Sequence, residues 1–263
     1  MGALRARPRR LSEPTIPDPV TESQLQPTRA LRACPRCRTE EPVLKVDTTY
    51  SQDLVRCQSC QLTFTNAAVP PVPATGIEYL DRFHEICGPI VPGRFQDVFH
   101  EGFEAGTMRR ELVKLYAWAV PMPRVLDRFA SHSPIVEVGA GGGYWALLLR
   151  GLGADVLALD EKPYENHWVE RGWGGVEVGG PDDLKTIEGR ALLLCWPPMR
   201  EMALECLTHF RGDTVLYVGE GEWGCCATDQ FFEALHLEYA LDATLAIPQW
   251  PGMHDRVEIW HRS

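Results

Sequence analysis

The C-terminal half of this sequence predicts an α/β fold: a doubly wound, mostly parallel sheet of seven strands that ends in an antiparallel hairpin. Two observations carry this prediction. From residue 131 onward, short apolar runs alternate with helical stretches, the pattern of a parallel sheet with helices on both faces. In addition, the apolar run at residues 134–138 leads directly into a glycine-rich turn and then a helix, as in ligand-binding units of such sheets.

Each element follows from this alternation. We expect strands at residues 135–138, 156–159, 175–178, 191–195, 214–218, 243–247 and 257–260, and helices at residues 144–152, 181–187, 200–210 and 229–239. No helix separates the last two strands, so the turn at Pro251 and Gly252 is expected to join them as an antiparallel pair.

Three further segments precede this domain of residues 131–263. Residues 1–32 are rich in Pro, Arg, Ser, Thr and Gln without periodicity, which predicts a disordered basic tail. Residues 33–66 form a cysteine module. Residues 67–130 combine a proline-rich linker with a helical segment that we expect to cover the active site, and its clearest helix is expected at residues 104–119. One of Tyr79, His84 and Trp118 in this segment is expected to contact substrate.

The distribution of charge limits the function classes. The net charge is −10, but the first 38 residues hold eight arginines against three acidic residues, so the remainder carries −15. An acidic body argues against a large nucleic-acid surface, although the basic head can offer a local contact. No apolar window reaches the length of a membrane span and no hydrophobic stretch follows the N-terminal arginines, so we expect a cytoplasmic protein without a membrane partner.

Four of the nine cysteines form two close pairs, Cys34 with Cys37 and Cys57 with Cys60, separated by 19 residues. Two such pairs at this spacing predict a zinc ribbon with four thiolate ligands. A closed site of this kind leaves no position for water, so the Zn²⁺ ion is expected to be structural. A redox dithiol is the alternative, but it does not explain why there are two pairs.

The glycine-rich turn is the most informative motif. Its pattern is Glu137-x-Gly139-x-Gly141-x-Gly143, and a second apolar run ends in Asp160, 21 residues after Gly139. Glycines permit a tight turn and close approach of a ligand to the backbone, and an acid at this distance suits ribose hydroxyls. The dinucleotide fingerprint requires glycine at position 144, where this chain has tyrosine.

In these features the chain resembles the class I S-adenosylmethionine (SAM)-dependent methyltransferases, over about residues 131–263. The family has the acid and G-x-G-x-G motif, an acid at the end of the second strand, and a final antiparallel hairpin. The resemblance implies that Asp160 binds the ribose, that Asp182 or Asp183 approaches the adenine, and that four residues line the methionine end of SAM: Glu137, Gly139, Gly141 and Gly143. The alternative is a non-catalytic Rossmann-like fold or a dinucleotide enzyme with a variant loop.

Further candidates follow the fourth and fifth strands. Many family members that act on amino groups carry Asn/Asp-Pro-Pro-Tyr/Phe after the fourth strand, and here Trp196 replaces the polar residue. Because its only polar group is a donor, Trp196 is expected to stack on a flat or cationic acceptor or to pack under the cofactor. Glu220, Glu222 and His254 are candidate catalytic or acceptor-binding groups. The alternative for the two glutamates is a solvated acidic loop, and the alternative for His254 is a turn that is stabilised by its own hydrogen bonds.

We therefore expect a SAM-dependent methyltransferase that acts on a small-molecule acceptor. The first alternative is an RNA methyltransferase that docks through the zinc ribbon and the Arg-rich tail, an arrangement similar to that of some ribosomal RNA guanine methyltransferases. The second is a SAM-binding or zinc-ribbon adaptor without catalytic activity.

Overall fold

The computed structural model describes residues 75–87, 108–164 and 166–263 in full, residue 59, and the backbone of residues 42–47, 52–57, 63–65 and 102–107. In the N-terminal part, β1 (Pro42–Asp47), β2 (Gln52–Cys57) and β3 (Thr63–Thr65) form an antiparallel sheet in that order. Cys34, Cys37 and Cys60 lie outside the described residues, and only the backbone of Cys57 is described. The zinc site and the boundaries of the N-terminal segments therefore stay predictions.

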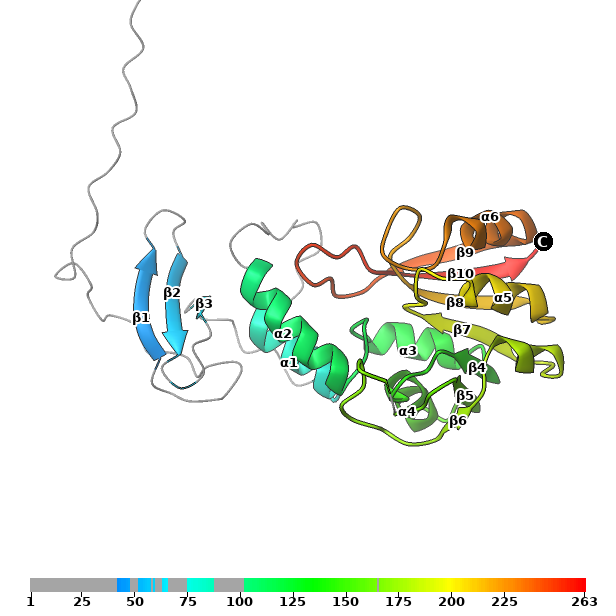
Figure 1. The fold of residues 1–263 in the computed structure, drawn as a ribbon, viewed down its shortest axis with the longest axis horizontal. Coiled ribbons are helices and arrows are strands. Elements are labelled where there is room, and N and C mark those ends of the chain that lie inside the picture. Colours follow the sequence, from blue (N-terminus) through cyan, green and yellow to red (C-terminus); the bar gives the residue numbers. More distant parts are fainter. Residues whose placement is uncertain are drawn as a thin grey trace, which may run out of the picture.

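The C-terminal half contains the predicted seven-stranded sheet, in the order β6-β5-β4-β7-β8-β10-β9 (Figure 1). Its strands are β4 (Ile135–Val138), β5 (Val156–Asp160), β6 (Val176–Val178), β7 (Ala191–Cys195), β8 (Thr214–Gly219), β9 (Tyr239–Ala246) and β10 (Arg256–Arg262). The first five are parallel, whereas β10 pairs antiparallel with both β8 and β9. The doubly wound architecture and the terminal hairpin are confirmed.

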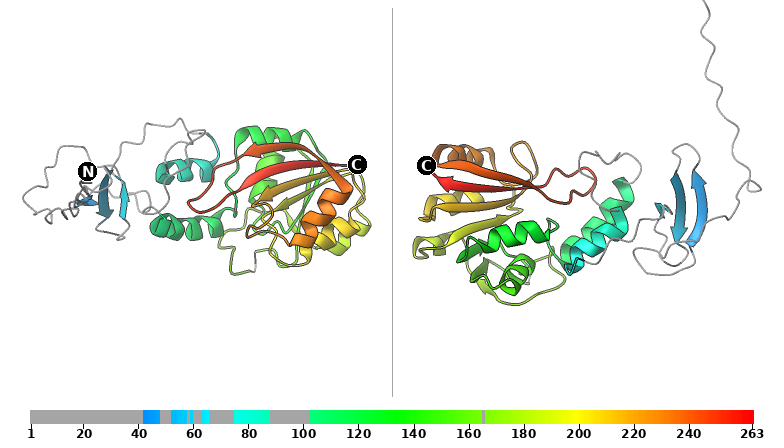
Figure 2. Two further views of the ribbon diagram at one scale, coloured as in Figure 1. Left: turned by 90° about the horizontal axis from the view of Figure 1, so that it is seen from above. Right: turned by 180° about the vertical axis from the view of Figure 1, so that it is seen from behind.

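Helices cover both faces of the sheet because alternate strand residues point to opposite sides. On one face α3 (Pro123–Ala130) and α4 (Tyr144–Gly151) pack on a core that includes Ile135 and Leu193. On the other face α5 (Met202–His209) and α6 (Asp229–Glu238) pack with Val136 and Leu192. The two views of Figure 2 show these two layers around the sheet.

The structure corrects three element predictions. The helix expected at residues 104–119 is α2 (Gly102–Leu115), which ends four residues earlier. The segment expected as a helix at residues 181–187 is a short 3-10 helix, Pro181–Lys185, which proline starts and Thr186 ends. The last helix ends at Glu238, and the chain enters β9 at once, four residues earlier than the expected strand at residue 243. Most of β9 is exposed, so its side chains lack the alternation of apolar and polar residues that identifies a strand.

Two upstream helices, α1 (Glu78–Cys87) and α2 (Gly102–Leu115), lie at the end of the sheet toward which β7 points (Figure 1). Tyr79 and Phe83 of α1 are buried in the same core as α3 and α4. The indole nitrogen of Trp250, in the loop between β9 and β10, donates a hydrogen bond of 3.1 Å to the hydroxyl of Tyr79. The helical segment is thus part of the domain and covers the carboxyl edge of the sheet. Among the helices of the described chain, no helix is both apolar and long enough to span a bilayer.

Candidate functional site at the carboxyl edge of the sheet

The glycine loop connects β4 to α4 and adopts a conformation that only glycine takes easily. Gly139, Gly141 and Gly143 have φ values of 79°, 55° and 81°, and Gly143 is the N-cap of α4. A side chain on Gly143 would place its Cβ 2.6 Å from the Cγ2 atom of Val176. The predicted motif therefore has a local structural reason at each of its three glycines.

Asp160 is joined directly to this loop. Its Oδ2 atom accepts a hydrogen bond of 2.8 Å from the amide of Gly141, and its Oδ1 atom accepts one of 2.9 Å from the amide of Lys162. The carboxylate is half-buried at the end of β5, beside β4 in the sheet. Each carboxylate oxygen has a further lone pair for a ligand hydroxyl, so the predicted ribose acid is both positioned and available.

Glu137, on β4 immediately before the loop, is a buried carboxyl group with a free oxygen. Its side chain is 2% exposed, and its Oε2 atom has no hydrogen-bond partner in the described part of the chain. Burial raises the pKa of Glu137 to about 8, although the charge of Arg150 and a hydrogen bond with the backbone of Ala146 act in the opposite direction. The group is largely protonated at neutral pH.

A segment between β5 and β6 covers the glycine loop. We call residues 166–173 the covering segment. The amide of Trp173 donates a hydrogen bond of 2.7 Å to the carbonyl of Gly142, and its indole donates one of 2.9 Å to the carbonyl of Leu115 at the end of α2. The amide of Glu170 also donates to the carbonyl of Lys114. The segment therefore fastens the loop to α2.

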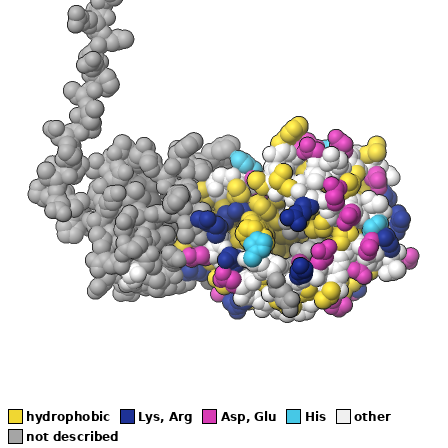
Figure 3. Space-filling view, viewed as in Figure 1, with side chains coloured by type: hydrophobic (Ala, Val, Ile, Leu, Met, Phe, Trp, Pro, Cys, Tyr) yellow, Lys and Arg dark blue, Asp and Glu magenta, His cyan; other side chains and the backbone are white. Residues whose placement is uncertain are grey.

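A cluster of three side chains lies at the end of β7. Trp196 has a positive φ of 53°, and its ring stacks on that of Trp118 with centroids 4.8 Å apart and an interplanar angle of 14°. The guanidinium of Arg109, on α2, lies 5.2 Å from the ring centroid of Trp118 and 5.0 Å from that of Trp196. In Figure 3, hydrophobic side chains gather in a hollow between α2 and the strand ends, with basic groups at its margins. These contacts fix Arg109 at the carboxyl edge of the sheet.

Asp255 completes this cluster from the loop before β10. It is fully buried; its Oδ1 atom accepts a hydrogen bond of 2.8 Å from the indole nitrogen of Trp196. Its Oδ2 atom has no partner among the described residues. Burial raises the pKa of Asp255 to about 7, against the opposing effects of the Trp196 hydrogen bond and the Arg109 charge.

The predicted catalytic residues are not gathered at one point. Glu220, after β8, accepts hydrogen bonds from the amides of Cys225 and His254, at 2.7 and 2.9 Å, and so ties two loops together. Burial favours a higher pKa for Glu220, but these backbone hydrogen bonds lower it. The His254 ring is largely exposed and lies 3.6 Å from Glu220, whereas Glu222 pairs with His236 of α6 at 3.3 Å. Their catalytic roles stay predictions.

The remaining candidates are mostly engaged elsewhere. Asp183 accepts a hydrogen bond from the amide of Gly180, and Asp182 pairs with Lys185, so both stabilise the 3-10 helix. Tyr79 is buried against Tyr116. The Nδ1 atom of His84 is buried without a partner in the described chain. Of the upstream candidates, only Trp118 reaches Trp196.

Arg109 was not identified from the sequence, because nothing in a helical pattern distinguishes this arginine from its neighbour Arg110. Asp255 lies between His254 and Arg256 in the sequence, but a turn sequence alone does not predict that its side chain is buried. No grouping of His, Cys, Asp and Glu suited to a metal ion occurs within the described residues.

The sheet with its terminal hairpin, and the glycine loop joined to the acid that ends β5, define a fold like that of SAM-dependent methyltransferases. No family model matches the chain, and no curated protein matches it.

Solved structures do resemble it. One is the 1,6-didemethyltoxoflavin-N1-methyltransferase of Burkholderia thailandensis, with 15% identity, a TM-score of 0.39, and coverage of 85% of this chain and 99% of that one. Another is the magnesium protoporphyrin IX methyltransferase of Synechocystis, with 13% identity, a TM-score of 0.38, and coverage of 72% and 92%. A third is the tRNA (uracil-54, C5)-methyltransferase of Pyrococcus abyssi, with 13% identity, a TM-score of 0.36, and coverage of 52% and 37%. At these identities and scores, we draw nothing about substrate from them.

Proposed function

We propose that this chain is a SAM-dependent methyltransferase and that its acceptor is a small molecule. The observation that supports this best is the joining of three features at one edge of the sheet. These are a left-handed glycine loop, the carboxylate of Asp160 hydrogen-bonded to it, and the partly unsatisfied buried carboxyl group of Glu137. Ligands of open α/β sheets bind at this edge.

The residues present fit SAM. Asp160 has free lone pairs for the ribose hydroxyls, and the glycine loop lets a ligand approach the backbone. The free Oε2 atom of Glu137 suits the ammonium group of the methionine part, because an adjacent cation would lower the raised pKa of Glu137 and stabilise its ionised form. When bound, SAM supplies a methyl group on a sulfonium for in-line displacement. The chain's part is to orient the acceptor and to exclude water.

The covering segment and the tryptophans contribute this exclusion of water. Trp118 and Trp196 stack beside α2, and Trp168 of the covering segment contacts Trp118 edge-on, with ring centroids 4.9 Å apart. Apolar rings at the strand ends raise the strength of electrostatic interactions with a bound acceptor. The net charge of −10 also favours a small acceptor over a nucleic acid.

Calorimetric titration tests the proposal. SAM, S-adenosylhomocysteine and NAD are titrated into the wild type, Asp160→Asn, and the control Asp155→Asn. Asp155 precedes the same strand but pairs with Arg190 at the other end of the sheet. We expect both adenosyl ligands to bind and NAD not to bind. Asp160→Asn should weaken adenosyl binding by about 1.5–3 kcal/mol through loss of charged hydrogen bonds, and Asp155→Asn should leave it unchanged. Failure of both adenosyl ligands to bind the wild type would refute the proposal.

The two alternatives have separate tests. RNA binding by the full chain at low salt, lost on deletion of residues 1–66, would replace the small-molecule proposal with the RNA one. SAM binding without turnover on any acceptor would favour the adaptor.

A further inference from the structure

Arg109 is half-buried and has an unused hydrogen-bonding edge. Its Nε and Nη2 atoms are inaccessible to solvent, and within the described chain neither has a hydrogen-bond partner. These two nitrogens carry the N–H groups along one edge of the planar guanidinium, and this edge can bind a carboxylate through two parallel hydrogen bonds. A buried donor without a partner costs free energy, and two on one edge indicate that a ligand completes the site.

The contacts of Arg109 leave this edge free. Its guanidinium carbon lies 5.2 and 5.0 Å from the ring centroids of Trp118 and Trp196, and a cation–π contact of this kind leaves the Nε and Nη2 donors without a hydrogen-bond acceptor. The charge of Arg109 lowers the pKa of the buried carboxyl group of Asp255, whose Oδ2 atom also lacks a partner among the described residues. The two groups therefore influence each other electrostatically without forming an ion pair.

The residues around Arg109 and the predicted cofactor residues lie at different strand ends. Asp160 and the glycine loop follow β5 and β4, whereas Trp196 follows β7 and Asp255 precedes β10. The end of β7 is one strand spacing, about 4.8 Å, from the end of β4, and the start of β10 is four spacings, roughly 19 Å, from the end of β5. Arg109 also disfavours a cationic acceptor beside it through repulsion of like charges.

We propose that the Nε–Nη2 edge of Arg109 binds a carboxylate of the methyl acceptor, so that the substrate class is a small organic acid. This inference rests on the methyltransferase function proposed above. Asp255, when protonated, donates a third hydrogen bond to the same anion. Trp196 positions Asp255 through its indole nitrogen.

The test is a nuclear magnetic resonance titration of the full chain that follows the ¹⁵Nε resonance of Arg109. Benzoate is the probe and benzamide, a neutral molecule of the same shape, is its control. We expect a saturable shift with benzoate at millimolar concentrations and none with benzamide. Arg109→Lys keeps the charge but loses the two-pronged edge, and should weaken benzoate binding by roughly ten- to a hundred-fold. Arg110→Lys, at the exposed neighbouring position, should leave it unchanged. The absence of a shift, or an equal shift with benzamide, would overturn the proposal without depending on whether a variant folds.

A second arm identifies the source of the carboxylate. S-adenosylhomocysteine has a methionine-type carboxylate, whereas 5′-methylthioadenosine lacks it. If Arg109→Lys weakens the first ligand but not the second, and benzoate competes with the first, the carboxylate is the cofactor's and the acceptor proposal is wrong. Unchanged affinity for both, with benzoate binding to the complex, supports it. If neither adenosyl ligand binds the wild type, the methyltransferase function fails, while benzoate titration of the ligand-free chain still reports on Arg109.

Discussion

Replacing Glu137 with glutamine should make the protein progressively more stable than the wild type as the pH rises. Glu137 is 2% exposed and has a pKa raised by burial from 4.5 to about 8. A folded-state pKa above the unfolded value means that the folded protein binds the extra proton. The stability from this group is therefore fully present below about pH 4.5 and is lost as the pH rises to about 8. Glutamine has no such proton.

The size of the effect follows from the shift. A difference of roughly 3.5 pKa units corresponds to an upper limit of about 5 kcal/mol, at about 1.4 kcal/mol for each unit. Most of this change falls between pH 5 and pH 8, where the difference between variant and wild type should grow by about 3 kcal/mol. A constant offset from the new amide does not alter this slope, and contributions from other titrating groups cancel in the difference.

Urea denaturation of both proteins at half-unit pH intervals measures this slope. Glu177→Gln, at an exposed position on β6, is the matched control variant. A flat difference for Glu137→Gln would mean that Glu137 ionises normally. It would remove the reason for assigning its free oxygen to a ligand ammonium.

Three further changes test other parts of the site. Gly143→Ala should lower the free energy of unfolding by about 1–3 kcal/mol, because the residue has a φ of 81° and the new Cβ would contact Val176. Urea denaturation measures this change, and Gly151→Ala is the control because there is open space around Gly151. In the wild type, benzoate binding should weaken as the pH rises through about 7, because Asp255 then loses its proton. Asp255→Asn should remove this pH dependence, and calorimetry at several pH values measures it. An unchanged pH profile in the variant would assign the dependence to another group. The charged or titratable groups that influence Asp255, or are influenced by it, are Arg109, Glu220, His254, Tyr79, Cys195, Cys225 and Cys226. Glu220→Gln should speed hydrogen exchange of the Cys225 or His254 amide, because one amide loses its acceptor; equal protection in both proteins would contradict the loop-tying role.

The buried strands of the fold were predictable from the sequence. The strands at residues 135–138 and 191–195 were placed at their observed bounds, since buried parallel strands read as continuous apolar runs between turn residues. The exposed β9 was placed four residues late because residues 239–242 continue the composition of the preceding helix. The start of this edge strand depends more on its pairing with β10 than on the β-propensity of its own residues.

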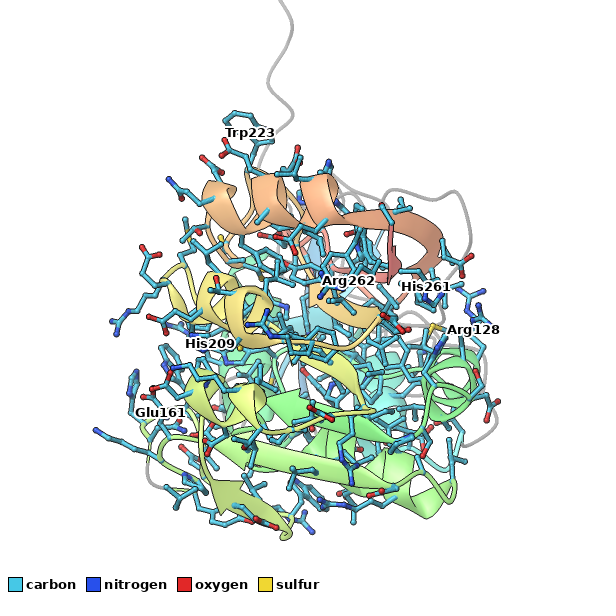
Figure 4. The ribbon with its side chains drawn as sticks, turned by 90° about the vertical axis from the view of Figure 1, so that its right-hand side faces the viewer. Arg128, Glu161, His209, Trp223, His261 and Arg262 are labelled. Atoms are coloured by element: carbon cyan, nitrogen blue, oxygen red, sulfur yellow. The ribbon has the colours of Figure 1, made fainter. Side chains whose placement is uncertain are left out.

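The residues of the site also divide into those that a local sequence motif identifies and those that only the fold brings together. The glycine loop and Asp160 are local motifs, and their joining through the Gly141 amide agrees with the predicted spacing. The cluster of Arg109, Trp196 and Asp255 comes from three elements far apart in sequence, so no local pattern reveals it. Trp223 is part of neither the glycine loop with Asp160 nor the Arg109 cluster: its side chain is 90% exposed and projects beyond α6 (Figure 4).

The covering segment has a thermodynamic consequence. It donates hydrogen bonds from Trp173 to the glycine loop and from both Trp173 and Glu170 to the last turn of α2, the helix that carries Arg109. If a ligand at the glycine loop orders the covering segment, it also orders the last turn of α2, and a second ligand at Arg109 then loses less conformational entropy on binding. In that case the two affinities are linked, and each ligand strengthens the other by the same factor.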